Sequence, residues 1–220
     1  SGSFSFTAIA IMILWHKSNR IQIAHIEKRP PENQLKQAEN IAEIFKMSAC
    51  DIGVGDLGYG ANQIKIIQDG GYSMDTGKHF EGVTNNVFFG CRSISDDTKP
   101  IQIFDEATDE HGDQVGRVQI DKTSGIESLI ESMENKVYHP EFASDKSKSR
   151  VKLMIPSKKD YEIDFLLKDL SNITRKDLHN LDKIISDPRQ RPRKEYNHPP
   201  DSVMALVYGI AALKVKAQSE

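Results

Sequence analysis

Two aspartates stand where their carboxylates could hold a metal ion. The first, Asp56, comes where a short stretch of small and apolar residues ends and a glycine turn begins, which predicts the carboxyl end of a strand. In an open α/β sheet, that end of a strand faces the crevice in which ligands bind. Gly55, Gly58 and Gly60 would leave room for the backbone of a substrate. The alternative is that Asp56 only caps the turn or the next helix, and the spacing does not decide between these interpretations.

The second aspartate, Asp201, begins the last apolar helix and follows Pro199 and Pro200. Prolines fix the start of a helix, and a carboxylate in the first turn is favoured by the helix dipole, so an N-cap explains this residue. The other interpretation is a rigidly held ligand for a divalent cation, since Mg²⁺ takes oxygen ligands from carboxylates and substrate phosphates. Two such ions could stabilise both the attacking water and the leaving oxygen at a phosphodiester. From the residues alone, the N-cap is the simpler interpretation.

The remaining titratable residues offer weaker candidates. His198 lies three residues before Asp201 and could assist that site or contact phosphate, although a surface histidine beside prolines is the commoner arrangement. Asp51 lies at the start of the strand that ends in Asp56, where exposure to solvent explains it. The other histidines are scattered and show no metal-ligand spacing.

Three basic stretches, at 146–152, 158–159 and 189–194, could follow a phosphate backbone, although a solvated surface is the default for a run of charge. The third is the stronger candidate because it leads directly into His198 and Asp201. The cations considered for DNA binding are Lys146, Lys148, Arg150, Arg189, Arg191, Arg193 and Lys194. The turn at 58–60 is not an ATP-binding P-loop, because it lacks the Gly-Lys-Ser/Thr ending.

Length and composition favour a folded α/β domain. The chain has 220 residues, 38% hydrophobic and 28% charged, which is typical of a globular rather than a disordered protein. Its net charge of -3 allows a DNA-cutting enzyme with local basic patches but does not argue for one. Cys50 and Cys91 are too few for a disulfide scaffold or a zinc motif, which fits a reducing intracellular setting. The apolar run at 4–15 is too short to span a bilayer.

The elements that would position the two aspartates alternate between strands and helices. Periodicity predicts a hairpin of strands at 4–15 and 21–26, a helix at 33–47, the strand that ends in Asp56, and a helix at 61–69 closed by Gly70 and Gly71. Further strands are expected at 79–92 and 115–120, helices at 122–133, 161–170 and 201–217, and loops at 96–113 and 144–152. Thr123 or Ser124 should cap the helix at 122–133.

Four stretches, in this order, resemble the nuclease half of phage terminase large subunits. They are FSFTAIAIMIL at 4–14, VGDLGYGAN at 54–62, VQIDKTSGIESLIESMENKVYHP at 118–140 and YNHPPDSVMALVYGIAAL at 196–213. The second and fourth are the more specific, and together the four span nearly the whole chain. Their joint order is a better argument than any one of them.

The resemblance implies a ribonuclease-H-like fold, an α/β fold in which a mixed central sheet is flanked by helices. Residues 1–220 would then form a single nuclease domain without the ATPase domain. In this family three acidic residues hold two Mg²⁺ or Mn²⁺ ions, and Asp56 matches the second acid and Asp201 the third. The first acid lies on a strand before the Ser-x-Thr segment, which the resemblance places upstream of Ser1.

The function that the resemblance implies is a metal-dependent endonuclease of the viral genome-packaging motor. It would hydrolyse phosphodiester bonds of concatemeric double-stranded DNA, with one ion activating water and the other stabilising the leaving 3′ oxygen. Contacts to DNA should be mostly to phosphates, so binding should weaken with salt. The implied partners are double-stranded DNA, the terminase ATPase domain, the portal and the small terminase subunit. The implied location is the cytoplasm of the host cell, without a membrane.

Two alternatives remain open. Another nuclease of the same superfamily, such as a Holliday-junction resolvase or a transposase, would act on branched DNA rather than a linear duplex. A non-catalytic DNA-packaging or docking module would use Asp56 and Asp201 only to cap helices, and Mg²⁺ would then have no effect. A sugar-kinase-like ATPase is disfavoured because the phosphate loops of that fold are not visible.

Overall fold

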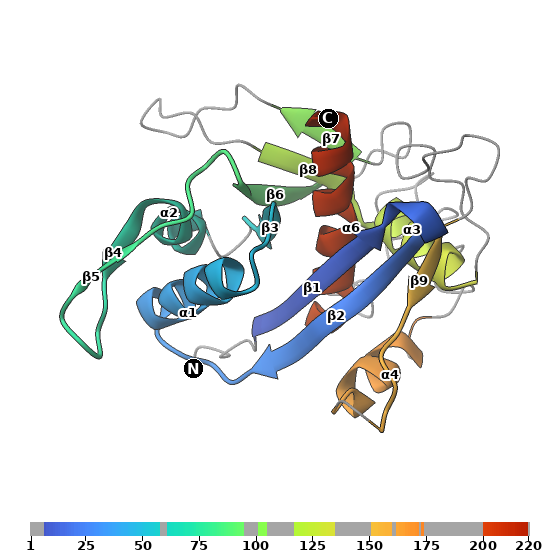
Figure 1. Cartoon of the computed structure of the whole chain (residues 1–220), viewed down its shortest axis with the longest axis horizontal. Coiled ribbons are helices and arrows are strands. Elements are labelled where there is room, and N and C mark those ends of the chain that lie inside the picture. The colour runs from blue at the N-terminus through green and yellow to red at the C-terminus, as the bar shows by residue number, and fades with distance from the viewer. Residues whose placement is uncertain are drawn as a thin grey trace, which may run out of the picture. The chain divides into compact units, whose positions relative to one another are not determined.

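A computed structural model describes residues 7–57, 61–94, 101–104, 117–134, 151–159, 162–171, 173 and 200–219 of the chain. These residues form mixed α/β structure with five α-helices and three sheets (Figure 1). Contacts divide the chain into two compact units, each assembled from segments that are separate in sequence. The α/β class is therefore confirmed, whereas the ribonuclease-H-like arrangement and the single domain stay predictions.

The first unit, which takes in 30–122 and the chain from Tyr208 onward, contains a four-stranded sheet. Its strands are β3 (Gly53–Asp56), β6 (Phe88–Ile94), β7 (Ile101–Phe104) and β8 (Arg117–Asp121). They lie in the order β3-β6-β8-β7, so β3 stands at one end of the sheet. β3, β6 and β8 run parallel, and β7 runs antiparallel to β8. The carboxyl ends of three strands, including the one that carries Asp56, therefore lie at the same edge.

Two helices, α1 (Gln34–Met47) and α2 (Ala61–Asp69), supply the core on one face of this sheet. The side chain of Asn33 caps α1 by accepting a hydrogen bond from the backbone of Leu35 at 2.9 Å. The two helices pack against each other, and α2 also contacts β3 and β6 (Figure 1). The buried residues of this core are Ala38, Ala42, Ile64, Ile67, Val83 and Phe88.

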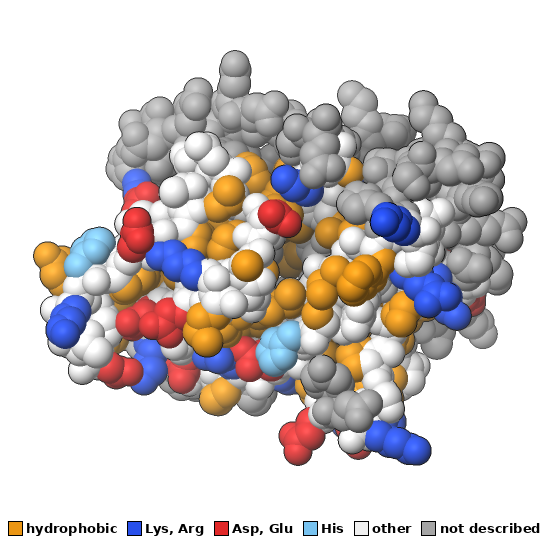
Figure 2. Space-filling view, viewed as in Figure 1, with side chains coloured by type: hydrophobic (Ala, Val, Ile, Leu, Met, Phe, Trp, Pro, Cys, Tyr) orange, Lys and Arg blue, Asp and Glu red, His pale blue; other side chains and the backbone are white. Residues whose placement is uncertain are grey.

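A hairpin of β4 (Gly70–Tyr72) and β5 (His79–Glu81) extends from α2. Tyr72 and Met74 are exposed, and the Tyr72 ring meets the His79 ring edge-on with centroids 5.5 Å apart. Figure 2 shows hydrophobic side chains beside a histidine at the end of the molecule where this hairpin lies in Figure 1. The hairpin thus carries some apolar side chains on its surface, while Phe80 of β5 packs against the core.

The second unit, which takes in 6–29 and 123–207, contains a three-stranded sheet with the order β1-β2-β9. Its elements are β1 (Thr7–Trp15), β2 (Arg20–Arg29), β9 (Lys152–Met154) and the helices α3 (Lys122–Met133) and α4 (Asp164–Ser171). β1 and β2 form an antiparallel hairpin, joined by a short 3₁₀ turn at His16–Ser18 and by Asn19 in the left-handed conformation, with φ of 50°. The predicted hairpin is confirmed.

A bulge interrupts the pairing of β2 with β1. His25 pairs with Ile11 and Ile23 pairs with Met12, so Ala24 is an extra residue on β2. Because of this extra residue, Ile23 and Ile26 are both buried although they are three positions apart. The bulge therefore keeps the apolar residues on both sides of it on one face of the strand.

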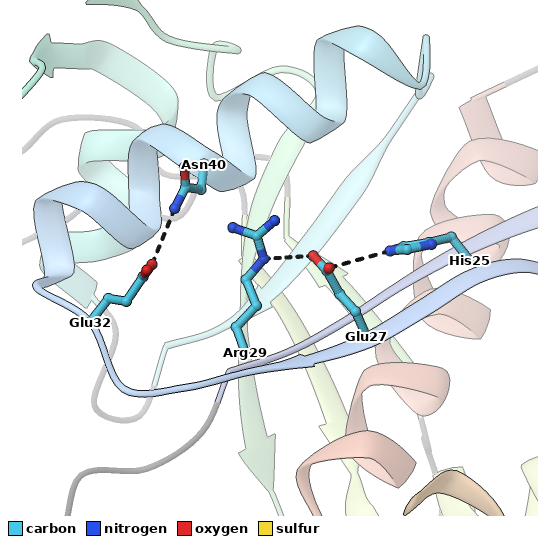
Figure 3. Close-up of polar contacts among 5 residues, drawn as sticks. All are labelled: His25, Glu27, Arg29, Glu32 and Asn40. Carbon is cyan, nitrogen blue, oxygen red and sulfur yellow. Dashed lines mark hydrogen bonds and ion pairs between the residues drawn. The ribbon is translucent and has the colours of Figure 1, made fainter. Parts of the chain in front are cut away.

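Polar side chains gather on the last part of β2 (Figure 3). Glu27 lies between two neighbours: its Oε1 accepts a hydrogen bond from Arg29 Nε at 2.6 Å, and its Oε2 is 3.6 Å from His25 Nε2. Figure 3 also shows Asn40 of α1, whose side-chain amide donates to Glu32 at 3.1 Å. The charge of Arg29 is therefore balanced on its own strand.

The last helix, α6 (Asp201–Ser219), contributes residues to both units, with the division falling after Val207. Most of its residues are buried, as the continuous apolar pattern predicts. None of the described helices is both long and apolar enough to cross a membrane.

Three predictions about elements are wrong in detail. The strand expected at 79–92 is two strands, β5 and β6, because the intervening backbone turns to bond α2: Val83 N donates to Ile67 O at 2.9 Å, and Thr84 N donates to Gln68 O at 3.0 Å. The loop expected at 96–113 contains β7, which pairs with β8 along its whole length. Hydrogen bonds to other elements of the fold, rather than local composition, determine the structure of these two segments.

One prediction about a helix end is confirmed and one is wrong. Gly70, which follows α2, has φ of 87°, the left-handed geometry of the predicted C-cap, and Gly70 and Gly71 then pair as the first residues of β4. Thr123 and Ser124 lie within the first turn of α3, which begins one residue earlier, so neither precedes the helix. The loop predicted at 144–152 lies outside the described residues, except that Lys152 begins β9.

Candidate active site

The glycines of β3 allow the core to press against one face of the strand. A Cβ added at Gly53 would collide with the Phe88 ring, and one added at Gly55 would lie 2.6 Å from Cδ1 of Ile64. Because side chains alternate along a strand, Asp56 points to the opposite face. The functional interpretation of Gly55 is therefore wrong, since this glycine makes room for the core rather than for a substrate.

The face that carries Asp56 is lined by neighbouring strands. Asp56 is paired in register with Cys91 of β6, and Cys91 is paired with Val118 of β8. Partners in a parallel ladder share a face, so these three side chains form a row across the sheet. Cys91 and Val118 are fully buried, whereas Asp56 at the end of the row is exposed. The row thus consists of two buried apolar side chains followed by a solvent-accessible carboxylate.

Tyr208 of α6 also reaches Asp56. Its phenol is buried and interacts electrostatically with the carboxylate of Asp56. Burial raises the pKa of Tyr208 most, and the negative charge of Asp56 and the nearby Cys91 raise it further. Ser93 partly opposes this shift in pKa, although its buried Oγ makes no hydrogen bond of acceptable geometry within the described part of the chain. The phenol therefore stays protonated near neutral pH.

Cys91 is a structural thiol rather than a nucleophile. Burial raises the pKa of Cys91 to about 12, with a further rise from the charge of Asp56 and a decrease from Lys122 at the start of α3. A thiol with such a pKa is neutral near pH 7 and unreactive. Both Cys50 and Cys91 are free thiols. The charges of Asp56 and Lys122 both act at this part of the sheet.

The sequence analysis passed over Asp121, another carboxylate at the end of a parallel strand. Its signal was the same as that of Asp56, since the apolar alternation of β8 stops there. Asp121 is buried and is paired in register with Ile94, three positions beyond Cys91. An odd number of positions places Asp121 on the opposite face from Asp56. The strand register therefore separates these two acids.

Tyr208 was also passed over. It lies in a segment that is mostly apolar, where the pattern indicates only another core residue. The available signal was its hydroxyl, which needs a hydrogen-bond partner when it is buried.

Asp201 occupies the first turn of α6. The carbonyl of Pro200 accepts hydrogen bonds from the backbone of Val203 at 2.9 Å and of Met204 at 3.1 Å. Pro200 is therefore the N-cap, and Asp201 is the first helical residue. The N-cap interpretation of Asp201 is wrong, although the helix dipole still favours a carboxylate there. The Asp201 side chain is exposed.

A hydrogen bond from the next residue ties α6 to α4. Ser202 is buried, and its hydroxyl donates to Oδ2 of Asp169 at 2.6 Å. Asp169 is itself half-buried on α4. The start of α6 is thus held by a charge-assisted hydrogen bond within the second unit.

The other predicted site residues fall mostly outside the described part of the chain. His198 and all seven cations proposed for DNA binding lie there, namely Lys146, Lys148, Arg150, Arg189, Arg191, Arg193 and Lys194. Lys158, from the second basic stretch, is exposed and pairs with Asp164 at 2.7 Å. Asp56 belongs to the first unit and Asp201 to the second. Within the described ranges, no group of three or more His, Cys, Asp or Glu residues gathers as a metal site.

Comparison of the chain with protein-family models, with curated proteins and with solved structures finds no match.

Proposed function

We propose that this chain is a metal-dependent endonuclease of the phage terminase type, with a ribonuclease-H-like fold. The observation that carries the proposal is Asp56, an exposed carboxylate at the carboxyl end of a parallel strand. Ligand sites in open α/β sheets lie at this edge. The resemblance at 54–62 and 196–213 supplies the chemistry, and the position of Asp56 agrees with it.

The order of elements also supports the proposal. A hairpin, a helix, the strand that ends in Asp56 and a second helix follow one another as the sequence pattern predicts, and an α/β order of this kind is compatible with the proposed fold. β3 stands at one end of its sheet, an arrangement compatible with a further strand that would carry the family's first acid. The closing helix begins with an exposed aspartate.

The donor set fits hard divalent cations. Asp56 and Asp201 are exposed carboxylates, the ligand type that Mg²⁺ and Mn²⁺ take. Bound in a pair, such ions supply Lewis-acid stabilisation of a phosphodiester under attack by water. On the resemblance, Asp56 and Asp201 are each proposed as a metal ligand, and the basic stretches are proposed to bind DNA phosphates. Double-stranded DNA, the ATPase domain, the portal and the small terminase subunit are the proposed partners.

Plasmid cleavage with Mn²⁺, Mg²⁺ or EDTA tests the proposal. Asp56→Asn and Asp201→Asn should each lower the metal-dependent rate by at least about 100-fold, because loss of even an outer-shell partner costs about 10–100-fold. Asp51→Asn is the matched control, since Asp51 is an exposed acid just before β3. The control should cut as fast as the parent.

Each other outcome has a definite meaning. Cutting that persists in EDTA, or that survives both substitutions, contradicts the proposed site. Preference for branched over linear DNA would identify a resolvase-like nuclease. If the parent does not cut, the same assay is repeated with a chain extended upstream to include the family's first acid. Failure of that chain as well would leave the docking module as the better hypothesis.

A further inference from the structure

We propose that the outward face of the β1-β2-β9 sheet binds single-stranded nucleic acid, with Trp15 stacking on a base and Arg20 and Lys152 holding the neighbouring phosphates. Lys152 ends one of the basic stretches, whereas Trp15 and Arg20 lie outside all three of them. The inference goes beyond the proposed function, because this surface uses neither a carboxylate nor a metal ion.

Strand register brings the three side chains into one row. Trp15 of β1 is paired with Arg20 of β2, and Arg20 is paired with Lys152 of β9. Residues paired across strands share a face of the sheet, and neighbouring strands lie about 4.8 Å apart. The row therefore places one cation about 5 Å and the other about 10 Å from the strand that carries the indole.

The face that carries this row is turned away from the core. Ile21 and Leu153, which directly follow Arg20 and Lys152, are 0% and 3% exposed. Side chains alternate between the two faces along a strand, so both cations lie opposite the core, and both are exposed. Figure 2 shows hydrophobic side chains over the β1–β2 hairpin, with Lys and Arg side chains toward its turn. Within the described part of the chain, the row is therefore accessible to a ligand.

The contacts of Trp15 leave its ring face as the part that can bind. Its Nε1 donates a hydrogen bond to Oε1 of Gln22 at 3.0 Å, so the indole N–H is already used. Trp15 is 50% exposed, and no ring or cation of the described residues is stacked on it. An aromatic face stacks on unpaired bases of any sequence, whereas the bases of a duplex are stacked on one another. The exposed indole therefore favours a single strand over a duplex.

The charges around the indole fit a phosphate backbone. β1, β9 and the turn between β1 and β2 contain no acid, and this turn adds a third exposed cation, Lys17. The single acid of β2, Glu27, lies toward the far end of the strand and bonds Arg29. Among the residues that the structure describes, Lys17, Arg20 and Lys152 form no ion pair. Their positive charge is therefore available to phosphates.

An anionic membrane surface would offer the same charge but fits this geometry less well. In an interfacial anchor, apolar side chains enter the lipid while the cations stay at the headgroups. Here the indole and the two cations project side by side from one row of a sheet. This arrangement suits a base that lies beside its own phosphates.

Fluorescence tests the inference directly, because Trp15 is the only tryptophan in the sequence. The whole chain is titrated in EDTA with oligodeoxythymidylate, oligouridylate, duplex DNA and inorganic polyphosphate. At least one of the two single strands should quench the fluorescence saturably, because a base stacks on the indole. Polyphosphate should bind without quenching, and the duplex should quench little. EDTA prevents metal-dependent cleavage, so the result does not depend on the proposed nuclease activity.

Variants separate stacking from charge. Trp15→Leu should weaken binding of a labelled oligodeoxythymidylate by about 5–150-fold, and Trp15→Tyr, which keeps an aromatic ring, should recover most of that loss. Arg20→Gln and Lys152→Gln should each reduce the slope of log affinity against log salt by about 0.7. Lys168→Gln removes an exposed cation of α4 and is the control, which should bind as the parent does.

Four results overturn the inference. Neither single strand might bind, or one might bind without quenching, which would leave the indole without a role. Full affinity in Trp15→Leu would place the nucleic acid elsewhere on the chain. Equal quenching by polyphosphate would show a response to charge alone. Binding to vesicles of phosphatidylserine and phosphatidylcholine, with a blue shift of the Trp15 emission and no response to oligonucleotides, would identify a membrane surface instead.

Discussion

Asp56 and Asp201 are both exposed carboxylates at the end of an element, but their surroundings are built in different ways. Around Asp56 stand Cys91 and Tyr208, which come from elements far apart in sequence. Around Asp201, the described contacts are those of a helix start, with Ser202 tied to Asp169 one residue later. The first site depends on long-range packing, and the second on local helix geometry. Substitutions near the first should therefore disturb the fold more broadly than those near the second.

The largest effect should come from pH. The folded pKa of Cys91 is about 12 against 9.0 for an unperturbed thiol, so its contribution to stability is complete below pH 9 and is lost between about pH 9 and 12. The free energy of unfolding should fall by up to about 1.4 kcal/mol per pH unit in that window, because the unfolded thiol ionises first. Cys91→Ala should show a shallower decline in urea unfolding across the same window. If the free energy of unfolding falls equally steeply with pH in parent and variant, the Cys91 thiol is more accessible to water than its burial implies.

A smaller effect is expected from overfilling β3. Gly53→Ala should lower the free energy of unfolding by about 1–3 kcal/mol, because the added methyl group meets the Phe88 ring, which is backed by Phe45. Urea unfolding measures the loss. The double variant with Phe88→Leu should lose less than the two single variants together, because the smaller side chain vacates that space. Strict additivity would refute the proposed collision.

The smallest effect should arise at the start of α6. Ser202→Ala removes a 2.6 Å hydrogen bond to Asp169 and should cost about 1–2 kcal/mol in urea unfolding. Ser171→Ala is the matched control, since its exposed hydroxyl donates to the Lys168 carbonyl at 2.8 Å and should contribute less than about 0.5 kcal/mol. If both variants lose the same free energy of unfolding, the buried hydrogen bond of Ser202 contributes no more than the exposed one of Ser171.

Local patterns were enough to predict the main elements of the fold. Alternation and turn residues predicted the β1–β2 hairpin, and apolar periodicity predicted α1, α2, α3 and α6 nearly to their ends. The strand β7 could not be predicted in this way, because it is short and lies in an acidic segment. Its identity as a strand depends on its partner β8, and local composition contains no information about that partner.

The candidate site was predictable only in part. A carboxylate after an apolar stretch indicated Asp56, and the same signal also fits Asp121, which only the strand register assigns to the other face. Gly55 was misinterpreted because a glycine has the same local pattern whether it makes room for a ligand or for a core side chain. The electrostatic interaction between Tyr208 and Asp56 joins residues that are far apart in sequence, and no local pattern could predict it.

The extra residue at Ala24 has a consequence for changes in chain length. Deleting Ala24 would make Ile23 and His25 consecutive, and their partners Met12 and Ile11 are already consecutive. The hairpin could then pair without interruption, and every side chain of β2 would keep its face. Deleting any other residue in the interior of β2 would have to move the bulge or turn part of the strand over. Ala24 is thus the position at which this hairpin should best tolerate the loss of one residue during evolution or engineering.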